Sequence, residues 1–168
     1  MTEPAGPPPT HSGFVALIGA TNAGKSTLLN RLVGAKVSIV THKVQTTRSI
    51  IRGIATHGNA QIVFIDTPGI FRPRRRLDRA MVATAWSGAR DAERGIRGDA
   101  EAILSSLADV AQPKILILNK IDRVKREMLL ALTHEANARV AFERTFMISA
   151  LTGSGCEDLL DYFAEALP

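Results

Sequence analysis

The sequence predicts a three-layer α/β domain in which helices cover both faces of a mostly parallel sheet. Three observations lead to this prediction: apolar runs of strand length recur, segments with helical spacing separate them, and short polar loops follow several of the runs. Strands that alternate with helices run parallel, because each helix returns the chain to the same end of the sheet. Loops at the carboxyl ends of such strands meet at one edge, where we expect the functional site.

The individual elements follow from the length and spacing of the apolar residues. Strands are predicted at residues 14–18, 49–57, 61–65, 114–118 and 145–148. The run at 49–57 alternates imperfectly and is predicted to be an antiparallel edge strand. Trp86 is expected to be buried against the sheet. Helices are predicted at 25–32, 77–89, 99–108, 125–140 and 157–167.

Residues 19–26 match the phosphate-binding pattern GxxxxGK[ST], between a predicted strand and a predicted helix. Glycines let several backbone N–H groups converge on an anion, and the positive end of the helix adds to that field. Lys25 is predicted to reach the β- and γ-phosphates, and the Ser26 hydroxyl to ligate Mg²⁺. The alternative is a glycine-rich turn, which the flanking strand and helix disfavour.

The tetrapeptide Asn119-Lys120-Ile121-Asp122 indicates which base is bound. The Asp122 carboxylate can accept hydrogen bonds from N1–H and the exocyclic amine of guanine, whereas adenine would leave the charge unpaired. The tetrapeptide is weak evidence alone, but it follows a strand downstream of a phosphate loop. The sequence therefore predicts a guanine-nucleotide site.

Two further loops complete the predicted site. Asp66 begins the segment Asp-Thr-Pro-Gly and is predicted to hold Mg²⁺ through a water, while the Gly69 N–H senses the γ-phosphate. The segment could also be only a turn, since proline and glycine are turn residues. The backbone of Ser149-Ala150-Leu151 is predicted to touch the guanine carbonyl.

Residues 13–168, with these motifs in this order, resemble the P-loop GTPases, and more narrowly the Era family. The narrowing rests on residues 37–48, which end in Gln45-Thr46-Thr47-Arg48 and look like the Era switch I. The resemblance implies a Ras-like fold, GTP and GDP as ligands with Mg²⁺, GTP hydrolysis, and the small ribosomal subunit with its rRNA as partner. It also implies a cytoplasmic protein, either free or peripheral at the inner membrane.

The resemblance assigns roles residue by residue. Thr47, in preference to Thr46, is implied to ligate Mg²⁺ and bind the γ-phosphate. The implied catalytic groups are Lys25, Thr47 and Gly69, and the implied Mg²⁺ ligands are Ser26, Thr47 and Asp66. The implied nucleotide contacts are Asn22, Ala23, Gly24, Lys25, Ser26, Thr27, Asp66, Gly69, Asn119, Lys120, Asp122, Ser149, Ala150 and Leu151.

Two residues refine the expected hydrolysis. Ile70 stands where Ras-like enzymes carry a water-orienting glutamine, so a slow intrinsic rate is expected. Asn22 stands where related GTPases ligate K⁺, which could replace the charge of an arginine finger. Alternatively, Asn22 only tolerates a tight loop conformation.

One stretch departs from the family pattern. Residues 70–118 should hold a helix, a central strand and another helix, yet 90–98 are polar and contain no apolar run of strand length. We therefore predict that the central strand expected near residues 90–95 is missing, a loss of about nine residues. Closing the gap would move the guanine loop by about 4.8 Å from the phosphate loop, so this chain is expected to bind GTP poorly or to be unstable.

Composition and length agree with one domain. The chain has 168 residues, 45% of them hydrophobic, which is enough for one core. Residues 1–12 are predicted to be a disordered proline-rich tail before the domain at 13–168, and the KH domain that follows in the Era family is absent from the sequence. The single cysteine, Cys156, excludes an internal disulfide. No run of eighteen apolar residues is present, so no transmembrane segment is expected.

The net charge of +5 concentrates in Arg72-Pro73-Arg74-Arg75-Arg76, which is either a solvated face or a patch for RNA phosphates. Three hypotheses on function remain open: an Era-type GTPase switch, a nucleotide-independent binding module or impaired fragment, and a different GTPase of the same superfamily.

Overall fold

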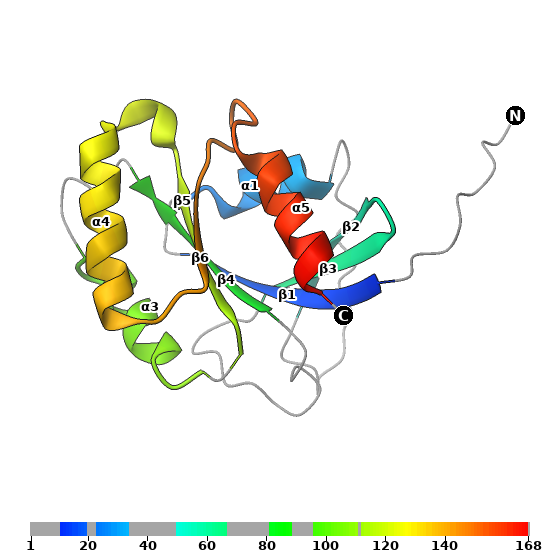
Figure 1. Cartoon of the computed structure of the whole chain (residues 1–168), viewed down its shortest axis with the longest axis horizontal. Helices are drawn as coiled ribbons and strands as arrows, with labels where there is room; N and C mark the ends of the chain where they lie inside the picture. Colours follow the sequence, from blue (N-terminus) through cyan, green and yellow to red (C-terminus); the bar gives the residue numbers. More distant parts are fainter. Residues whose placement is uncertain are drawn as a thin grey trace, which may run out of the picture.

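The computed structural model describes residues 11–19, 23–33, 50–66, 81–88, 96–110 and 112–167. They form a six-stranded sheet in the order β2-β3-β1-β4-β5-β6, flanked by helices (Figure 1). Every strand pair is parallel except β2 with β3. The strands are β1 (His11–Gly19), β2 (Ile50–His57), β3 (Ala60–Asp66), β4 (Met81–Ser87), β5 (Lys114–Asn119) and β6 (Arg144–Met147). The helices are α1 (Lys25–Val33), α3 (Asp99–Leu107), the short 3₁₀ helix η2 (Ile121–Arg123), α4 (Arg126–Arg139) and α5 (Cys156–Ala166). The predicted α/β fold class is confirmed.

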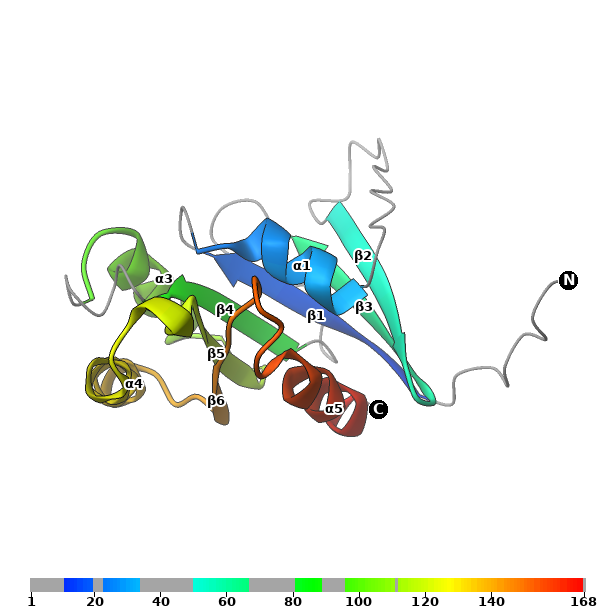
Figure 2. The same cartoon turned by 90° about the horizontal axis from the view of Figure 1, so that it is seen from above.

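Two apolar cores lie on opposite faces of the sheet. One core packs α1 and α5 against the sheet through residues such as Leu28, Leu32 and Phe163. The other packs α3 and α4 through residues such as Leu104 and Leu132. Figure 2 shows the helices distributed over both faces, so the three predicted layers are present. Each Å² of apolar surface that these cores remove from water contributes about 25 cal/mol to the free energy of folding, and this is the main stabilising contribution.

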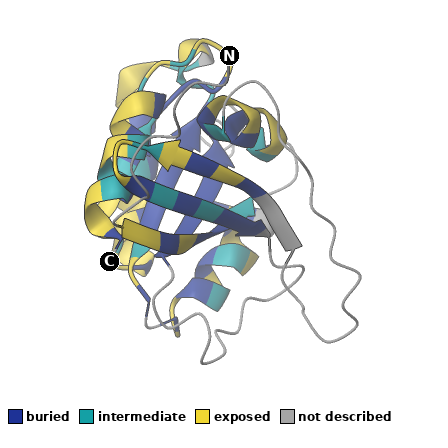
Figure 3. Cartoon of the chain, turned by 90° about the vertical axis from the view of Figure 1, so that its right-hand side faces the viewer, coloured by how far each residue is buried: buried dark blue, intermediate teal, exposed yellow. Residues whose placement is uncertain are grey.

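The antiparallel strand β2 forms one edge of the sheet, as the imperfect alternation predicted. Its pairing with β3 shifts register between Ile51 and Gly53, which is a bulge of the kind that limits edge pairing with other chains. Figure 3 shows exposed residues along this side, whereas the inner strands are buried. Ile54, on β2, is 45% exposed.

The prediction that the sheet lacks its central strand is wrong, and residues 89–95, near which that strand was expected, lie outside the described part. Strand β4 lies between β1 and β5 and pairs in parallel with both, with Leu17 opposite Ala83 and Ala85 opposite Ile117. The helix predicted at 77–89 is therefore wrong too, since Met81–Ser87 is a strand. The sheet has neither a hole nor a displaced β5, because this segment fills the central place.

The physical reason for the error is burial on both faces. All seven residues of β4 are buried, so the strand lacks the polar alternation that marks a half-exposed strand. Met81, Ala83 and Ala85 contribute to the core under α1 and α5. Val82 and Trp86 contribute to the core under α3 and α4. An alanine-containing apolar run of this length is compatible with a buried helix or a buried strand, and here tertiary pairing decides.

Trp86 is fully buried, and it lies on a strand of the sheet rather than on a helix packed against the sheet. Its indole Nε1–H donates to Thr84 Oγ1 at 3.1 Å, two residues earlier on the same face of β4. Both side chains have 0% exposure, so this hydrogen bond satisfies a polar group that burial would otherwise leave unpaired.

The remaining element boundaries differ from the predictions by only a few residues. β1 begins at His11, within the segment 1–12 that was expected to precede the domain, and residues 1–10 lie outside the described part. The basic run at 72–76 and the switch-like run at 37–48 also lie outside it. Within the described ranges, none of the helices has both the length and the apolar character needed to cross a bilayer.

Candidate functional site

The described parts of the predicted site come from three neighbouring regions at one edge of the sheet. The turn at Ala23–Gly24 leads from β1 into α1, the segment Asn119–Asp122 follows β5, and residues 149–155 follow β6. β1, β5 and β6 all run parallel, so their carboxyl ends lie at the same edge. The sheet thus brings these three regions together, as the sequence predicted.

Asn119 joins all three regions through its side chain. Its Nδ2 donates to the Ala23 carbonyl at 3.0 Å, and its Oδ1 accepts from the backbone N–H of Ala150 at 2.9 Å and of Lys120 at 2.8 Å. The side chain is 2% exposed, so these bonds are made away from water and fix the amide orientation. The backbone of residues 149–151 was predicted to touch the guanine carbonyl, and within it the Ala150 N–H already donates to Asn119.

The segment after Asn119 turns sharply toward solvent. Lys120 has a φ of 63°, in the left-handed region that non-glycine residues seldom adopt. Strain of this kind costs about 1–3 kcal/mol and is concentrated at functional sites. Asp122 lies in η2 and is exposed, so its carboxylate is accessible to a ligand at this edge.

The electrostatic field at the start of α1 favours binding of an anion. α1 has nine residues and no acidic residue in its first turn, so no side-chain carboxylate there offsets the positive end of the helix dipole. Lys25 and Ser26 open the helix, Lys25 being half-buried and Ser26 exposed, and Thr27 is exposed as well. Gly24 has a φ of 82°, which a residue with a Cβ adopts only at a cost.

The loop after β6 is closed by its own hydrogen bonds. The N–H of Ser149 donates to the Ser154 carbonyl at 3.0 Å, and the N–H of Gly153 donates to the Ser149 carbonyl at 2.8 Å. Cys156 lies beneath the loop, where burial raises the pKa of its thiol and the nearby Arg31 charge opposes that shift. The loop therefore has a defined shape, with Leu151 exposed at its tip.

A residue that the sequence interpretation missed also binds this loop. Arg31, in the last turn of α1, donates from Nε to the Ala150 carbonyl at 3.0 Å and from a terminal nitrogen to the Leu151 carbonyl at 2.6 Å. The sequence signal was weak, because a basic residue at the end of a helix is common for dipole reasons alone.

Several predicted site residues cannot be placed by these contacts. Asn22, Thr47 and Gly69 lie outside the described residues. Asp66 ends β3, the strand beside β1, but its side chain lies outside the described part. Its backbone position is at the same edge as the start of α1, because β1 and β3 are parallel.

Replacing Gly24 with alanine is expected to distort the site. The added Cβ would collide with the Asn119 side-chain amide and would sit at the unfavourable φ of 82°. We expect Gly24→Ala to lower guanine-nucleotide affinity by more than about tenfold, since displacing the buried Asn119 breaks hydrogen bonds worth about 1 kcal/mol each. Titration with a fluorescent GDP analogue measures this.

Gly58→Ala is the matched control for that substitution. Gly58 has a φ of 60° in the β2–β3 turn, and a Cβ there would meet nothing within 4 Å. It therefore shares the backbone penalty without the collision, and should leave nucleotide affinity unchanged. Equal effects of the two substitutions would contradict the proposed role of the Gly24–Asn119 contact.

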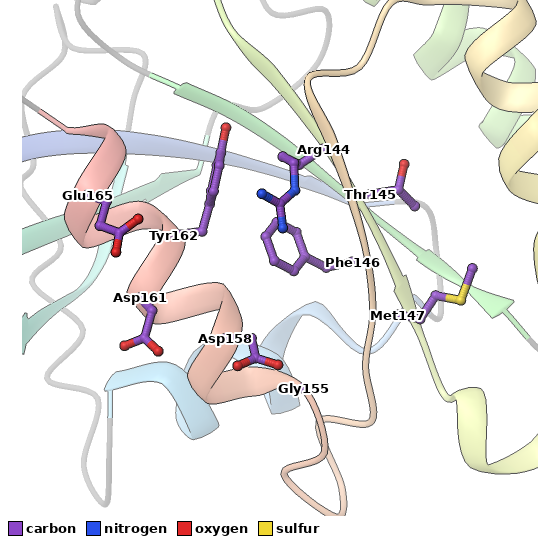
Figure 4. Close-up of a pocket in the computed structure, with 9 residues that line it drawn as sticks. All are labelled: Arg144, Thr145, Phe146, Met147, Gly155, Asp158, Asp161, Tyr162 and Glu165. Carbon is purple, nitrogen blue, oxygen red and sulfur yellow. The ribbon is translucent and has the colours of Figure 1, made fainter.

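A second groove lies between β6 and α5, and Gly155, at the end of the loop after β6, is one of the residues that line it (Figure 4). Its walls include the acidic residues Asp158, Asp161 and Glu165. The Arg144 guanidinium lies 5.3 Å from the Phe146 ring centre and 5.2 Å from that of Tyr162, which are cation–π distances. None of the predicted nucleotide contacts lines this groove, so it does not belong to the candidate site.

Comparison with known families gives a match to the model described as 50S ribosome-binding GTPase, over residues 14–134. Among curated proteins, GTPase Era of Rhizobium meliloti (strain 1021) is 75% identical over 173 residues, covering 98% of this chain and 55% of that protein. GTPase Era of Mesorhizobium japonicum is 73% identical over 175 residues, covering 99% and 56% respectively. The chain thus spans about half the length of the curated relatives it matches.

The aligned regions also differ in length. The match to the Mesorhizobium japonicum protein runs over 175 residues, whereas this whole chain has 168, so that relative carries at least seven residues without a counterpart here.

Two solved structures resemble the fold over most of the chain. A tyrosine-to-alanine variant of Aquifex aeolicus Era bound to GDP·AlF4⁻ has a TM-score of 0.69 and 32% identity, covering 95% of this chain and 58% of that one. A structure of Era with MgGDPNP and nucleotides 1506–1542 of 16S ribosomal RNA has a TM-score of 0.69 and 32% identity, covering 94% and 57%.

Proposed function

We propose that this chain, which belongs to the family of 50S ribosome-binding GTPases, is the guanine-nucleotide domain of an Era-type switch that binds and hydrolyses GTP. One observation carries the proposal: the buried Asn119 side chain bonds the turn before α1 and the loop after β6 at once. A phosphate-binding turn and a base-binding loop are thereby held at a fixed separation, as recognition of one nucleotide requires.

Each predicted nucleotide contact has a role in this proposal. Backbone N–H groups from Ala23 to Thr27 and the Lys25 ammonium bind the phosphates. Asp122 binds the guanine N1–H and amine, Lys120 lies over the turn before α1, and residues 149–151 face the guanine carbonyl. Lys120 supports this placement, since its Cε is 3.6 Å from where a Gly24 Cβ would be.

A magnesium ion is also proposed at this edge. The Ser26 hydroxyl is exposed at the start of α1, and Asp66 ends the adjacent strand, so two oxygen donors of the kind that Mg²⁺ prefers come from neighbouring elements. We propose that Ser26, Asp66 and Thr47 hold it. The ion would neutralise charge on the β- and γ-phosphate oxygens.

Hydrolysis is proposed to be slow and to depend on potassium. Lys25, Thr47 and Gly69 are the proposed catalytic contacts, and Ile70 lacks the polar atoms that would orient water. Asn22 is the proposed K⁺ ligand, and the cation would supply the charge stabilisation of an arginine finger.

The proposed partner is the RNA of the small ribosomal subunit. This rests on the Era structure solved with MgGDPNP and a 16S ribosomal RNA segment. The relatives are about twice as long as this chain, and we propose that residues 13–168 are the nucleotide domain of such a protein and that a KH domain reads the RNA. A ribosomal RNA partner would place this activity in the cytoplasm.

A second candidate is a domain that keeps the nucleotide site but has impaired turnover. The observation that favours it is the difference in aligned length, since the Mesorhizobium japonicum relative carries residues that have no counterpart in this chain. The Asn119 contacts proposed to carry guanine binding are present, so the loss expected in this candidate is in turnover rather than in binding.

Phosphate release from GTP by the purified chain distinguishes the two candidates. The Era-type switch predicts slow release that is faster in K⁺ than in Na⁺ at equal ionic strength and is abolished by Lys25→Ala. The impaired domain predicts saturable GDP binding without release in either salt. Release that Lys25→Ala leaves unchanged would contradict the Era-type switch, since that activity would not depend on the phosphate-binding lysine.

A further inference from the structure

Arg31 lies at the opposite end of α1 from the residues that begin it. Such a residue ordinarily stabilises the carbonyl end of its own helix. Here the guanidinium instead reaches the loop after β6, which is more than a hundred residues away in sequence, and donates to the carbonyls of Ala150 and Leu151 at 3.0 and 2.6 Å. A planar guanidinium can bridge two neighbouring carbonyls because its donors form a rigid fork.

The peptide groups of Ala150 are thereby held on both sides. The Ala150 N–H donates to Asn119 Oδ1 at 2.9 Å, and the Ala150 carbonyl accepts from Arg31 Nε at 3.0 Å. Ala150 itself is 2% exposed. A residue fixed through both its N–H and its C=O cannot rotate without breaking one of these bonds.

The guanidinium also lies near Gly153, on the same loop. A Cβ placed on Gly153 would lie 3.6 Å from the Arg31 guanidinium carbon, which is ordinary contact distance. Gly153 has a φ of 88° and donates to the Ser149 carbonyl at 2.8 Å, so the turn that Arg31 binds through Ala150 and Leu151 is also closed by its own backbone.

α1 consequently contacts the nucleotide-binding edge in two ways. At its start, the preceding turn is bonded to Asn119 through the Ala23 carbonyl. In its last turn, Arg31 is bonded to the loop that Asn119 also holds. The helix, the loop after β5 and the loop after β6 form a closed set of contacts, in which Arg31 is the member farthest from the phosphate turn.

We infer that Arg31 is a positioning residue for guanine recognition: it fixes the 149–151 loop against α1 so that the loop backbone meets the six-position of the base. The inference rests on the proposed function, which puts that loop against the guanine carbonyl. Arg31 acts through the loop and touches no nucleotide itself. Loss of the Arg31 side chain should weaken the binding of bases that have the six-position oxygen more than it weakens the binding of bases that lack it.

The test compares Arg31→Met with the unaltered chain on three nucleotides. GDP has both the six-position oxygen and the two-position amine, IDP lacks the amine, and 6-thio-GDP replaces the oxygen with sulfur, a weak acceptor. We expect Arg31→Met to lower the affinity for GDP and for IDP by the same factor of about ten. The affinity for 6-thio-GDP should fall by only about threefold or less. Methionine keeps the apolar stem, so packing along α1 is largely retained.

Two further variants complete the experiment. Arg139→Met also removes an exposed arginine from the last turn of a helix, and its nearest carboxylates, on Glu101 and Glu135, are 3.8 and 3.9 Å away. It should leave all three affinities unchanged. Arg31→Lys should restore GDP binding in part, because an ammonium can reach one of the carbonyls but cannot bridge both in a fixed plane.

The outcomes separate this inference from the proposed function. An equal loss of affinity for all three nucleotides would overturn the inference, and so would a lowered melting temperature with unchanged affinities. Either result would show that Arg31 has only a structural role. If the unaltered chain fails to bind GDP, the proposed function itself is overturned, and the inference falls with it.

Discussion

Asp122→Asn is expected to weaken GDP binding by about two to three orders of magnitude. The carboxylate accepts two hydrogen bonds from guanine in the proposed complex, and each charge-assisted bond contributes about 1.5–3 kcal/mol. The amide would present a donor where the base also donates, so one pair becomes unfavourable. Because Asp122 is exposed in η2, the substitution should leave folding intact, which circular dichroism checks.

The same substitution should shift preference toward xanthine. Xanthine has a carbonyl at position two, which can accept from the new asparagine amide. Competition of XDP and GDP against a fluorescent nucleotide measures the ratio of affinities. An Asp122→Asn variant that still prefers GDP as strongly as the unaltered chain would show that this residue does not read the base.

Trp86→Ala is expected to destabilise the fold by about 3–5 kcal/mol, the usual cost of truncating a buried aromatic residue. Trp86 has 0% exposure in β4, the strand that pairs with both β1 and β5, and the truncation also leaves the Thr84 hydroxyl without its indole donor. Urea unfolding followed by circular dichroism gives the change in free energy. Much of the stability of a domain this size would be lost.

Leu130→Ala provides the comparison. Leu130 is a large apolar residue on α4 that is 52% exposed, so truncation should cost under about 1 kcal/mol. If Trp86→Ala cost no more than Leu130→Ala, β4 would not occupy the core of the sheet. Trp86 is the chain's one tryptophan, so blue-shifted, poorly quenched fluorescence should report its burial directly.

The sequence was sufficient for most of the fold because most elements have local signals. Residues 115–118 form a short apolar run between Lys114, which follows a proline, and the polar Asn119, and the structure has β5 there. The α4 residues Leu129, Leu132 and Ala136 share one helical face, and all are buried as that spacing predicted. The fold class and the resemblance to the Era family are both confirmed, the latter by the family match and the relatives.

β4 could not be predicted because its evidence is not local. Met81–Ser87 has no alternation, and its strand conformation comes from pairing with β1 and β5, both distant in sequence. The family pattern places a strand near residues 90–95, whereas the structure has the central strand at Met81–Ser87, earlier in the chain.

The candidate site was predictable where a side chain has a fixed motif position. Asn119 and Lys120 were expected at the carboxyl end of a strand and lie there. Arg31 was not expected, because its partners are backbone carbonyls, which any sequence provides. The roles of the site residues, and those of Asn22, Thr47 and Gly69 in particular, stay predictions.

The central claim is that the regions joined by Asn119 form one guanine-nucleotide site. Its most direct test is displacement of a fluorescent GDP analogue from the purified chain in Mg²⁺ by unlabelled GDP or ADP. The account predicts saturable binding at one site per chain, complete displacement by GDP, and no displacement by ADP at a hundredfold higher concentration, about 2.7 kcal/mol of discrimination. Absence of saturable binding by the folded chain, or equal displacement by ADP, would contradict it.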